Sequence, residues 1–278
     1  MGLGKILRYV VVAALCIIVL SPIGSIVWLS LSSDRNRLST ELTLNYYEFI
    51  QSGWLFQDPV YQKYYPNIYI ITLNTLFLAG SVTVLFVIIS SMTGYVLSRY
   101  KIPARGTILG FFLVLHGFPT TTLIISLYFI LKSMNLLNSL WGVVLARLTV
   151  ELPLGVWVMK GFYDSVPWDV EMASLVDGAG RLKTWWHVIL PAVKPGIAAI
   201  SIFAFTAGWS EFIFVYTFIL DRTTWTLSNL IRGLMGELGT VSMNLIAALA
   251  MFYTLPILVF FIFTQKYLLK VALGGVKG

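Results

Sequence analysis

Two side chains of opposite charge lie four residues apart in a long apolar stretch of the chain. Arg147 and Glu151 both fall within residues 133–159, which carry no other charged residue. Residues four apart on a helix can pair, and burying either charge alone at bilayer depth costs about 2.5 to 3.5 kcal/mol on insertion scales. The spacing therefore predicts a mutual ion pair, which faces a water-filled path or serves as a structural link between helices. Pro153 follows at once and can break the helix near this point.

A second polar group occurs in the run Trp209-Ser210-Glu211-Phe212, within the apolar residues 195–220. A tryptophan ring can stack on the C–H surface of a sugar while a carboxylate accepts hydrogen bonds from its hydroxyls. The alternative is a tryptophan at the membrane interface beside a structural Glu211. A polar residue inside a membrane must face protein or water, so the candidate residues of an internal path are Asn74, Arg147, Glu151, Trp209 and Glu211.

The chain shows no other pattern for chemistry of its own. It has two histidines, His116 and His187, and one cysteine, Cys16, which gives no metal-site spacing and no disulfide. His116 is expected to be a hydrogen-bonded packing residue. Neither a phosphate-binding GxxxxGK[ST] sequence nor a GxSxG turn is present. The sequence therefore predicts no catalytic residues, no bound metal or cofactor, and energy supplied by another subunit.

The elements that position these residues are apolar stretches. Hydrophobic residues make up 58% of the 278 and charged residues 11%, which excludes an ordinary soluble domain. Each stretch reaches the roughly 20 residues needed to cross a bilayer as a helix. We expect an all-α membrane protein with one transmembrane domain over residues 1–278 and six spans, at about 9–33, 68–98, 106–131, 138–160, 195–220 and 242–265. The first is expected to be a retained span rather than a cleaved signal.

Charge sets the expected orientation. With both termini in the cytoplasm, twelve of the nineteen Lys and Arg residues lie inside and six lie outside, as the positive-inside rule requires. Residues 162–194, between spans four and five, are then cytoplasmic, and so is the tail, residues 266–278. The net charge of +7 is explained by topology, so no nucleic-acid partner is expected.

The outer loops are expected to carry contacts. The loop over residues 34–63 is rich in aromatic residues, which either sit at the membrane interface or form a docking surface. The loop over residues 221–239 contains Gly233, Gly236 and Gly239 and is expected to be a mobile segment that reaches a partner.

Residues 166–196 are predicted to form two short helices joined at a glycine. Pro167, with Asp169 and Glu171 behind it, is a helix-start signature. An apolar stripe follows at helical spacing, formed by Trp168, Met172, Leu175 and Ala179.

Gly178 or Gly180 can take the left-handed conformation that ends the first helix. The second helix, from Arg181, is expected to finish near Pro191. Such a hairpin suits either a groove on a partner protein or a membrane surface, and periodicity does not choose between them.

The run Asp177-Gly178-Ala179, with Ile189-Leu190-Pro191 ending thirteen positions after the glycine, resembles the EAA loop of binding-protein-dependent ABC importer permeases. Counting back from Gly178, the family's Glu-Ala-Ala positions fall on Met172, Ala173 and Ser174, and Glu171 is one place early. The resemblance implies a cytoplasmic EAA-type coupling hairpin whose ATPase-coupling residues are Met172, Ala173, Ser174, Asp177, Gly178, Ala179, Leu190 and Pro191.

Two further runs are similar to the carbohydrate-uptake group of these permeases. Trp209 to Phe212 resembles a Trp-Asn-Asp/Glu-Phe run, and the ending of the chain resembles the tail of the smaller permease of maltose-type importers. That likeness implies contacts with an ATPase from the tail residues Gly274, Gly275, Val276, Lys277 and Gly278.

The resemblance implies a multi-pass protein of a prokaryotic cell membrane that is not an enzyme. Its expected partners are an ATPase subunit dimer that binds ATP and Mg, a second homologous permease, an extracytoplasmic solute-binding protein and the lipid bilayer. The expected substrate is a sugar or oligosaccharide; alternatives are a polyol, a glycerol phosphate, or transport driven by an ion gradient.

Overall fold

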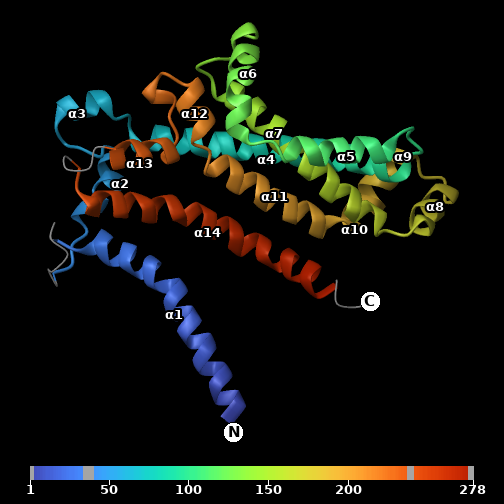
Figure 1. Ribbon diagram of the computed structural model, residues 1–278, viewed down its shortest axis with the longest axis horizontal. Helices are drawn as coiled ribbons and strands as arrows, with labels where there is room; N and C mark the ends of the chain where they lie inside the picture. The colour runs from blue at the N-terminus through green and yellow to red at the C-terminus, as the bar shows by residue number, and fades with distance from the viewer. Residues whose placement is uncertain (1–2, 34–40, 237–240, 275–278) are drawn as a thin grey trace. The chain divides into compact units, whose positions relative to one another are not determined.

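The computed structural model describes residues 3–33, 41–236 and 241–274, with side chains within 7–33, 41–236 and 241–266. In these ranges every regular element is a helix, and an isolated β-bridge pairs Ser32 with Leu42. The predicted all-α class is therefore confirmed for the described part of the chain (Figure 1).

The chain divides into two compact units. The first holds residues 1–69 and 229–257, with helices α1 (Leu3–Leu31), η1 (Asn45–Tyr47), α2 (Phe49–Ser52) and α3 (Pro59–Tyr64), most of α13 (Leu227–Gly236) and the start of α14 (Met243–Gly274). Within this unit, Asn244 links α14 to the end of α1. Its Nδ2 donates to the carbonyl oxygens of Leu29 and Ser32, at 3.0 and 2.8 Å. The aromatic outer loop thus contains short helices as well as connections.

The second unit holds residues 70–228 and 258–278. Its helices are α4 (Ile68–Arg99), α5 (Arg105–His116), α6 (Thr120–Ser133), α7 (Leu140–Asp164), α8 (Trp168–Val176), α9 (Arg181–Thr184), η2 (Trp185–Ile189), α10 (Leu190–Ala192), α11 (Lys194–Trp209), α12 (Ile213–Phe218) and η3 (Arg222–Thr224). α7 packs against α5, α6, α11 and α12. One apolar core joins α4, α6, α7, α11 and α12, because each is apolar enough to be buried on one face.

Four helices among the described residues are long and apolar enough to cross a membrane, over Leu7–Leu31, Pro59–Arg99, Leu140–Asp164 and Met243–Lys266. Two further candidates are bent pairs, so the number of spans is four, or up to six if each pair is one span. The six spans expected from the sequence agree with that upper value in number. The fifth candidate, Arg181–Ala192 with Lys194–Trp209, differs in its bounds from the expected residues 195–220, because it includes residues that were expected in the cytoplasmic hairpin.

The third expected span, residues 106–131, is not one straight helix. α5 and α6 meet at 98°, because Gly117 and Phe118 leave the helix before Pro119, whose backbone is extended at φ −58° and ψ 126°. A residue that precedes proline is pushed out of the helical conformation, so this proline starts a new helix.

Pro153 behaves differently from the expectation that it can break its helix. It lies inside α7, which continues from Leu140 to Asp164, and its side chain is buried. The interruption instead falls in the fifth expected span, where α11 ends at Trp209 and α12 begins at Ile213. The loop expected at 221–239 contains η3 and α13, so much of it is helical rather than irregular.

Candidate functional site

The expected hairpin is present as α8, a turn, and α9 continuing through η2 and α10. The turn is made by Gly178, whose φ is +85°, while Gly180 is extended at φ −68°. The backbone N–H of Gly178 donates to the carbonyl of Leu175 at 3.1 Å, and that of Ala179 donates to the carbonyl of Ser174 at 3.1 Å. Of the two candidate glycines, Gly178 is therefore the one that needs the left-handed conformation.

The second arm of the hairpin passes through Pro191 and ends one residue later, at Ala192. A π-helical turn, Trp185–Ile189, lies immediately before the proline segment. The chain then bends by 76° into α11 at Val193, whose ψ is 12°. The expected end near Pro191 is confirmed, and the π turn next to it was not expected.

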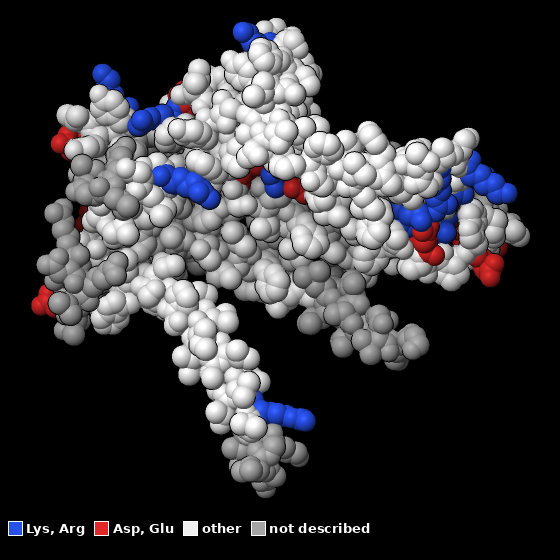
Figure 2. Space-filling model, viewed as in Figure 1, with Lys and Arg blue, Asp and Glu red and all other residues white. Residues whose placement is uncertain are grey.

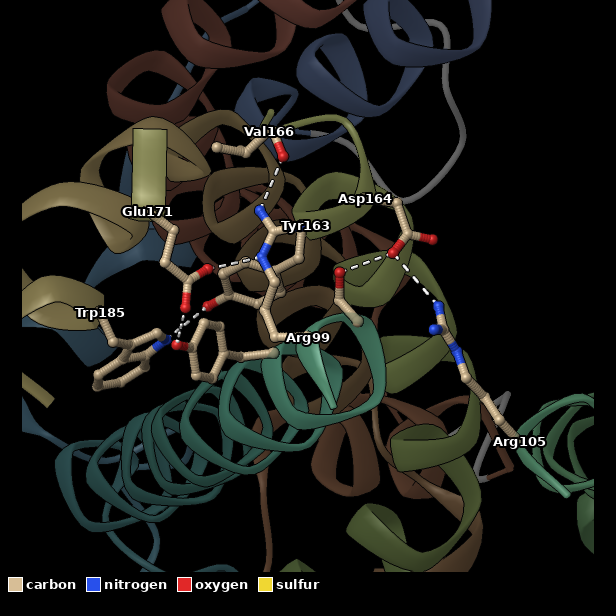
Figure 3. A network of polar contacts seen from close by, with 9 residues as sticks. Arg99, Arg105, Tyr163, Asp164, Val166, Glu171 and Trp185 are labelled. Atoms are coloured by element: carbon tan, nitrogen blue, oxygen red, sulfur yellow. Dashed lines mark hydrogen bonds and ion pairs between the residues drawn. The ribbon is translucent and has the colours of Figure 1, made fainter. Parts of the chain in front are cut away.

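A buried ion pair fixes the first arm of the hairpin to α4 (Figure 3). The Nε atom of Arg99 lies 2.8 Å from Oε2 of Glu171, and each side chain is 3% exposed. The two atoms do not align as a hydrogen bond, so charge holds this contact. The hydroxyl of Tyr95 donates to Oε1 of Glu171 at 2.7 Å, and Nη2 of Arg99 donates to the carbonyl of Val166 at 2.8 Å. Glu171 is thus an anchor as well as a first-turn acid.

A second set of polar contacts joins the root of the hairpin to α4 and α7. The hydroxyl of Tyr163 lies 2.7 Å from Oγ of Ser91 and accepts a hydrogen bond from Nε1 of Trp185 at 3.2 Å. Asp164 accepts from Ser98 at 2.6 Å and pairs with Lys160 and, at 3.4 Å, with Arg105. The hairpin is therefore fixed to two long helices by side chains from both of them.

The apolar stripe predicted on the first arm of the hairpin is largely exposed. Trp168 and Met172 are exposed, and Leu175 and Ala179 are half-buried, whereas the polar residues Glu171 and Thr184 point into the protein. The sequence analysis missed this because the partner of Glu171 comes from a distant helix. An exposed apolar face is the condition for insertion into a groove of another molecule.

The predicted coupling residues lie on the accessible side of the hairpin. Met172, Ala173, Asp177, Gly178 and Pro191 are exposed, and Ser174, Ala179 and Leu190 are half-buried. The most exposed apolar side chains of the hairpin are two that the sequence analysis did not select, Val176 at 86% and Leu182 at 75%. Basic side chains gather over the same α8–α9 end (Figure 2). The tail prediction falls mostly outside the described residues: Gly274 ends α14, and residues 275–278 are not described.

The predicted Arg147–Glu151 pair exists and has a third member. Nη2 of Arg147 lies 2.7 Å from Oε1 of Glu151, and Nη1 lies 3.1 Å from Oε2 of Glu211. Glu211 sits in the interruption between α11 and α12, where its Oε1 accepts the backbone N–H of Phe214 at 2.8 Å. We name Arg147, Glu151 and Glu211 the triad. Its formal net charge is −1, and its Arg147 and Glu151 side chains retain 19% and 14% exposure.

The other two candidate path residues are engaged elsewhere. Trp209 is fully buried, and its ring stacks on Phe205 with centroids 5.6 Å apart. Asn74 donates from Nδ2 to the carbonyl oxygens of Thr223 and Trp225. In the conformation described here, the three charged candidates come together, and these two hold protein groups.

Helices long and apolar enough to cross a membrane, a charged triad at a helix interruption and an exposed hairpin together define a multi-span membrane protein. The chain belongs to the family of binding-protein-dependent transport system inner membrane components, whose sequence model matches residues 87–270. This match confirms the resemblance to the permease family of these transport systems.

Known relatives cover nearly the whole chain. The maltodextrin transport system permease protein MalD of Streptococcus pneumoniae is 27% identical over 280 residues, which cover 99% of this chain and 96% of that protein. The maltodextrin transport system permease protein MdxG of Bacillus subtilis is 31% identical over 225 residues, or 81% and 78% of the two chains. A chain of a bacterial ABC transporter involved in the import of the acidic polysaccharide alginate shares the fold, with a TM-score of 0.75, 19% identity, and coverage of 95% and 96%.

Proposed function

We propose that this chain forms half of the translocation path of an ATP-driven importer for a neutral sugar or oligosaccharide. The observation that carries the proposal is an exposed apolar hairpin face on a base fixed by the buried Arg99–Glu171 pair. The names of the two maltodextrin permeases support the substrate class.

The hairpin is suited to receive work from an ATPase. ATP and Mg would be held by a partner ATPase dimer, whose groove would accept Met172, Val176 and the turn at Gly178. Since side chains of α4 and α7 hold the base of the hairpin, a push on its tip moves those helices with it. Packed helices that move as bodies provide alternating access.

The remaining partners follow from this role. A second homologous permease would form the other wall of the path, and an extracytoplasmic solute-binding protein would deliver the substrate. The protein would lie in a prokaryotic cell membrane. Both of its termini would face the cytoplasm, as the positive-inside rule favours.

The triad is suited to hydroxyl groups. Its carboxylates accept hydrogen bonds from hydroxyls, and its guanidinium donates. Because Arg147 is already paired with two carboxylates, it offers little attraction to a phosphate. This balance favours a neutral sugar over a glycerol phosphate. Trp209 would stack on a sugar only after the α11–α12 interruption moves.

The test is uptake by the complete complex reconstituted in vesicles. We expect import of a neutral oligosaccharide such as maltotriose or diacetylchitobiose to require ATP and the binding protein and to persist with an ionophore present. Uptake that ignores ATP and collapses with the ionophore would establish a gradient-driven transporter instead.

A further inference from the structure

Helix α4 is hydrogen-bonded at both ends to segments that are remote in the sequence. At one end, Tyr95 and Arg99 hold Glu171 and Val166 at the base of the hairpin. Toward the other end, Asn74 holds the carbonyl oxygens of Thr223 and Trp225 at 2.8 and 3.0 Å. Figure 1 shows α8 and α9 at one end of α4 and α12 near the other.

We name residues 221–227 the outer segment. Next to Asn74, Thr75 is fully buried, and its Oγ1 accepts the backbone N–H of Leu227 at 2.9 Å. Within the segment, Thr223 donates to Asp221 from its hydroxyl at 2.7 Å and from its backbone N–H at 2.9 Å. These bonds hold the pKa of the Asp221 carboxyl below its usual value. The segment is therefore braced internally and bonded to α4 through three groups.

The helix between these two ends is built to be stiff. It continues through Arg99 without a proline, and its length from Asn74 to Arg99 is roughly 37 Å at the α-helical rise per residue. At Gly94 its backbone approaches α7 so closely that a Cβ would lie 2.8 Å from Cβ of Met159. At Gly208 of α11, a Cβ would lie 2.8 Å from Cα of Ala79 in α4. Close-packed interiors pass on displacement rather than absorb it.

The path through α4 is separate from the covalent path. Along the chain, the hairpin continues α7 and leads into α11, and the outer segment follows α12. Neither connection passes through α4. A displacement of Glu171 can reach the outer segment through α4 because Arg99 and Tyr95 bridge to the hairpin at one end, and Asn74 and Thr75 bridge to the segment at the other.

We infer that α4 transmits displacement between the hairpin and the outer segment, with Arg99 and Asn74 as the positioning residues at its two ends. The inference rests on the proposed function, since it takes the hairpin as the receiver of work. As a consequence, a single helix, α4, couples the nucleotide state of the ATPase at the hairpin to the position of the outer segment.

The test follows the outer segment by labelling in the complete complex. Cys16 is the single cysteine, so Cys16→Ala removes the background, and Leu220→Cys places a thiol beside the outer segment at a position that is 87% exposed. The measurement is the labelling rate with an impermeant maleimide, with and without ATP plus vanadate, together with ATP hydrolysis and uptake. The reference protein is the Cys16→Ala/Leu220→Cys variant. We expect its labelling rate with ATP plus vanadate to differ from its rate without nucleotide.

In Asn74→Leu, we expect ATP hydrolysis to persist while the two labelling rates become equal. The matched control is Thr83→Val, on the same helix, because the Thr83 hydroxyl donates to the carbonyl of Ala79 within its own helix. Its two rates should differ as in the reference. In Arg99→Met/Glu171→Met, which removes both buried charges together, the rates should also become equal.

Two results would overturn the inference. One is Asn74→Leu with the full nucleotide-dependent change. The other is a reference protein that takes up substrate with ATP but shows no change at position 220, which leaves the proposed function intact. Absence of any ATP-dependent uptake would remove the proposed function and the inference together.

Discussion

The guanidinium of Arg99 and the carboxylate of Glu171 meet at 2.8 Å in a place where each side chain is 3% exposed. Nearby, Arg105 and Asp164 meet at 3.4 Å and are about one-third exposed. The base of the hairpin therefore contains a buried ion pair and a solvated one within the same few turns, and the two should respond differently to mutation.

Arg99→Met is expected to destabilise the protein by about 3 to 5 kcal/mol, because it leaves Glu171 buried without its counter-charge. Arg99→Met/Glu171→Met should recover most of that loss, since no isolated charge remains. Thermal unfolding of the purified complex measures both. Arg105→Gln is the control, with an expected loss of about 0 to 1 kcal/mol. A double variant no more stable than Arg99→Met would contradict the charge argument.

Gly178→Val is expected to leave the protein inserted in the membrane but to separate ATP hydrolysis from uptake. A β-branched residue at φ +85° is strained by about 1 to 3 kcal/mol, so the turn must change. Gly180→Ala is the matched control, because its φ is −68° and an added Cβ meets nothing within 4 Å. The ratio of substrate imported to ATP hydrolysed is the measurement. A normal ratio in Gly178→Val would rule out the rigid hairpin.

Arg147→Gln is expected to reduce uptake more than Glu151→Gln does. Loss of the guanidinium leaves two carboxylates facing each other, and Glu211 is nearly fully buried, whereas loss of Glu151 keeps the Arg147–Glu211 pair. Initial uptake rates over a range of substrate concentrations compare the two. Thr149→Val serves as control, because the Thr149 hydroxyl donates to the carbonyl of Leu145 within its own helix. Equal uptake by all three variants would exclude the triad from the path.

Deletion of residues 274–278 is expected to alter ATP hydrolysis by the assembled complex, since the resemblance implies that this tail contacts the ATPase. Lys277→Ala removes the charge of the tail but keeps the rest of it. This variant should change ATP hydrolysis less than the deletion does. Unchanged hydrolysis after deletion would show that the tail has no part in coupling.

Features set by neighbouring residues could be predicted from the sequence, and features set by distant ones could not. Local chemistry limited the hairpin turn to Gly178 or Gly180, and helical spacing predicted the Arg147–Glu151 pair. The burial of Glu171 depends on Tyr95, 76 residues away, and on Arg99, so no local pattern contains it.

The prolines show the same limit. Pro119 follows Gly117 and begins a new helix, whereas Pro153 lies buried inside a continuous α7. The residue type is the same, and the surrounding helices decide the result. The sequence predicted a possible break at Pro153 in the fourth expected span and none in the fifth. The fifth is the one that is interrupted, between Trp209 and Ile213, because a carboxylate that accepts a backbone N–H of α12 can start a new helix without any proline.

The π turn at Trp185–Ile189 takes one residue more than an α-helical turn does, because its hydrogen bonds join residues five apart instead of four. Removing one residue from this turn would restore α-helical winding. It would also rotate α9 by roughly 100° about the helix axis of this arm. The direction in which α9 faces relative to α11 is thus set by the winding of the residues Trp185–Ile189.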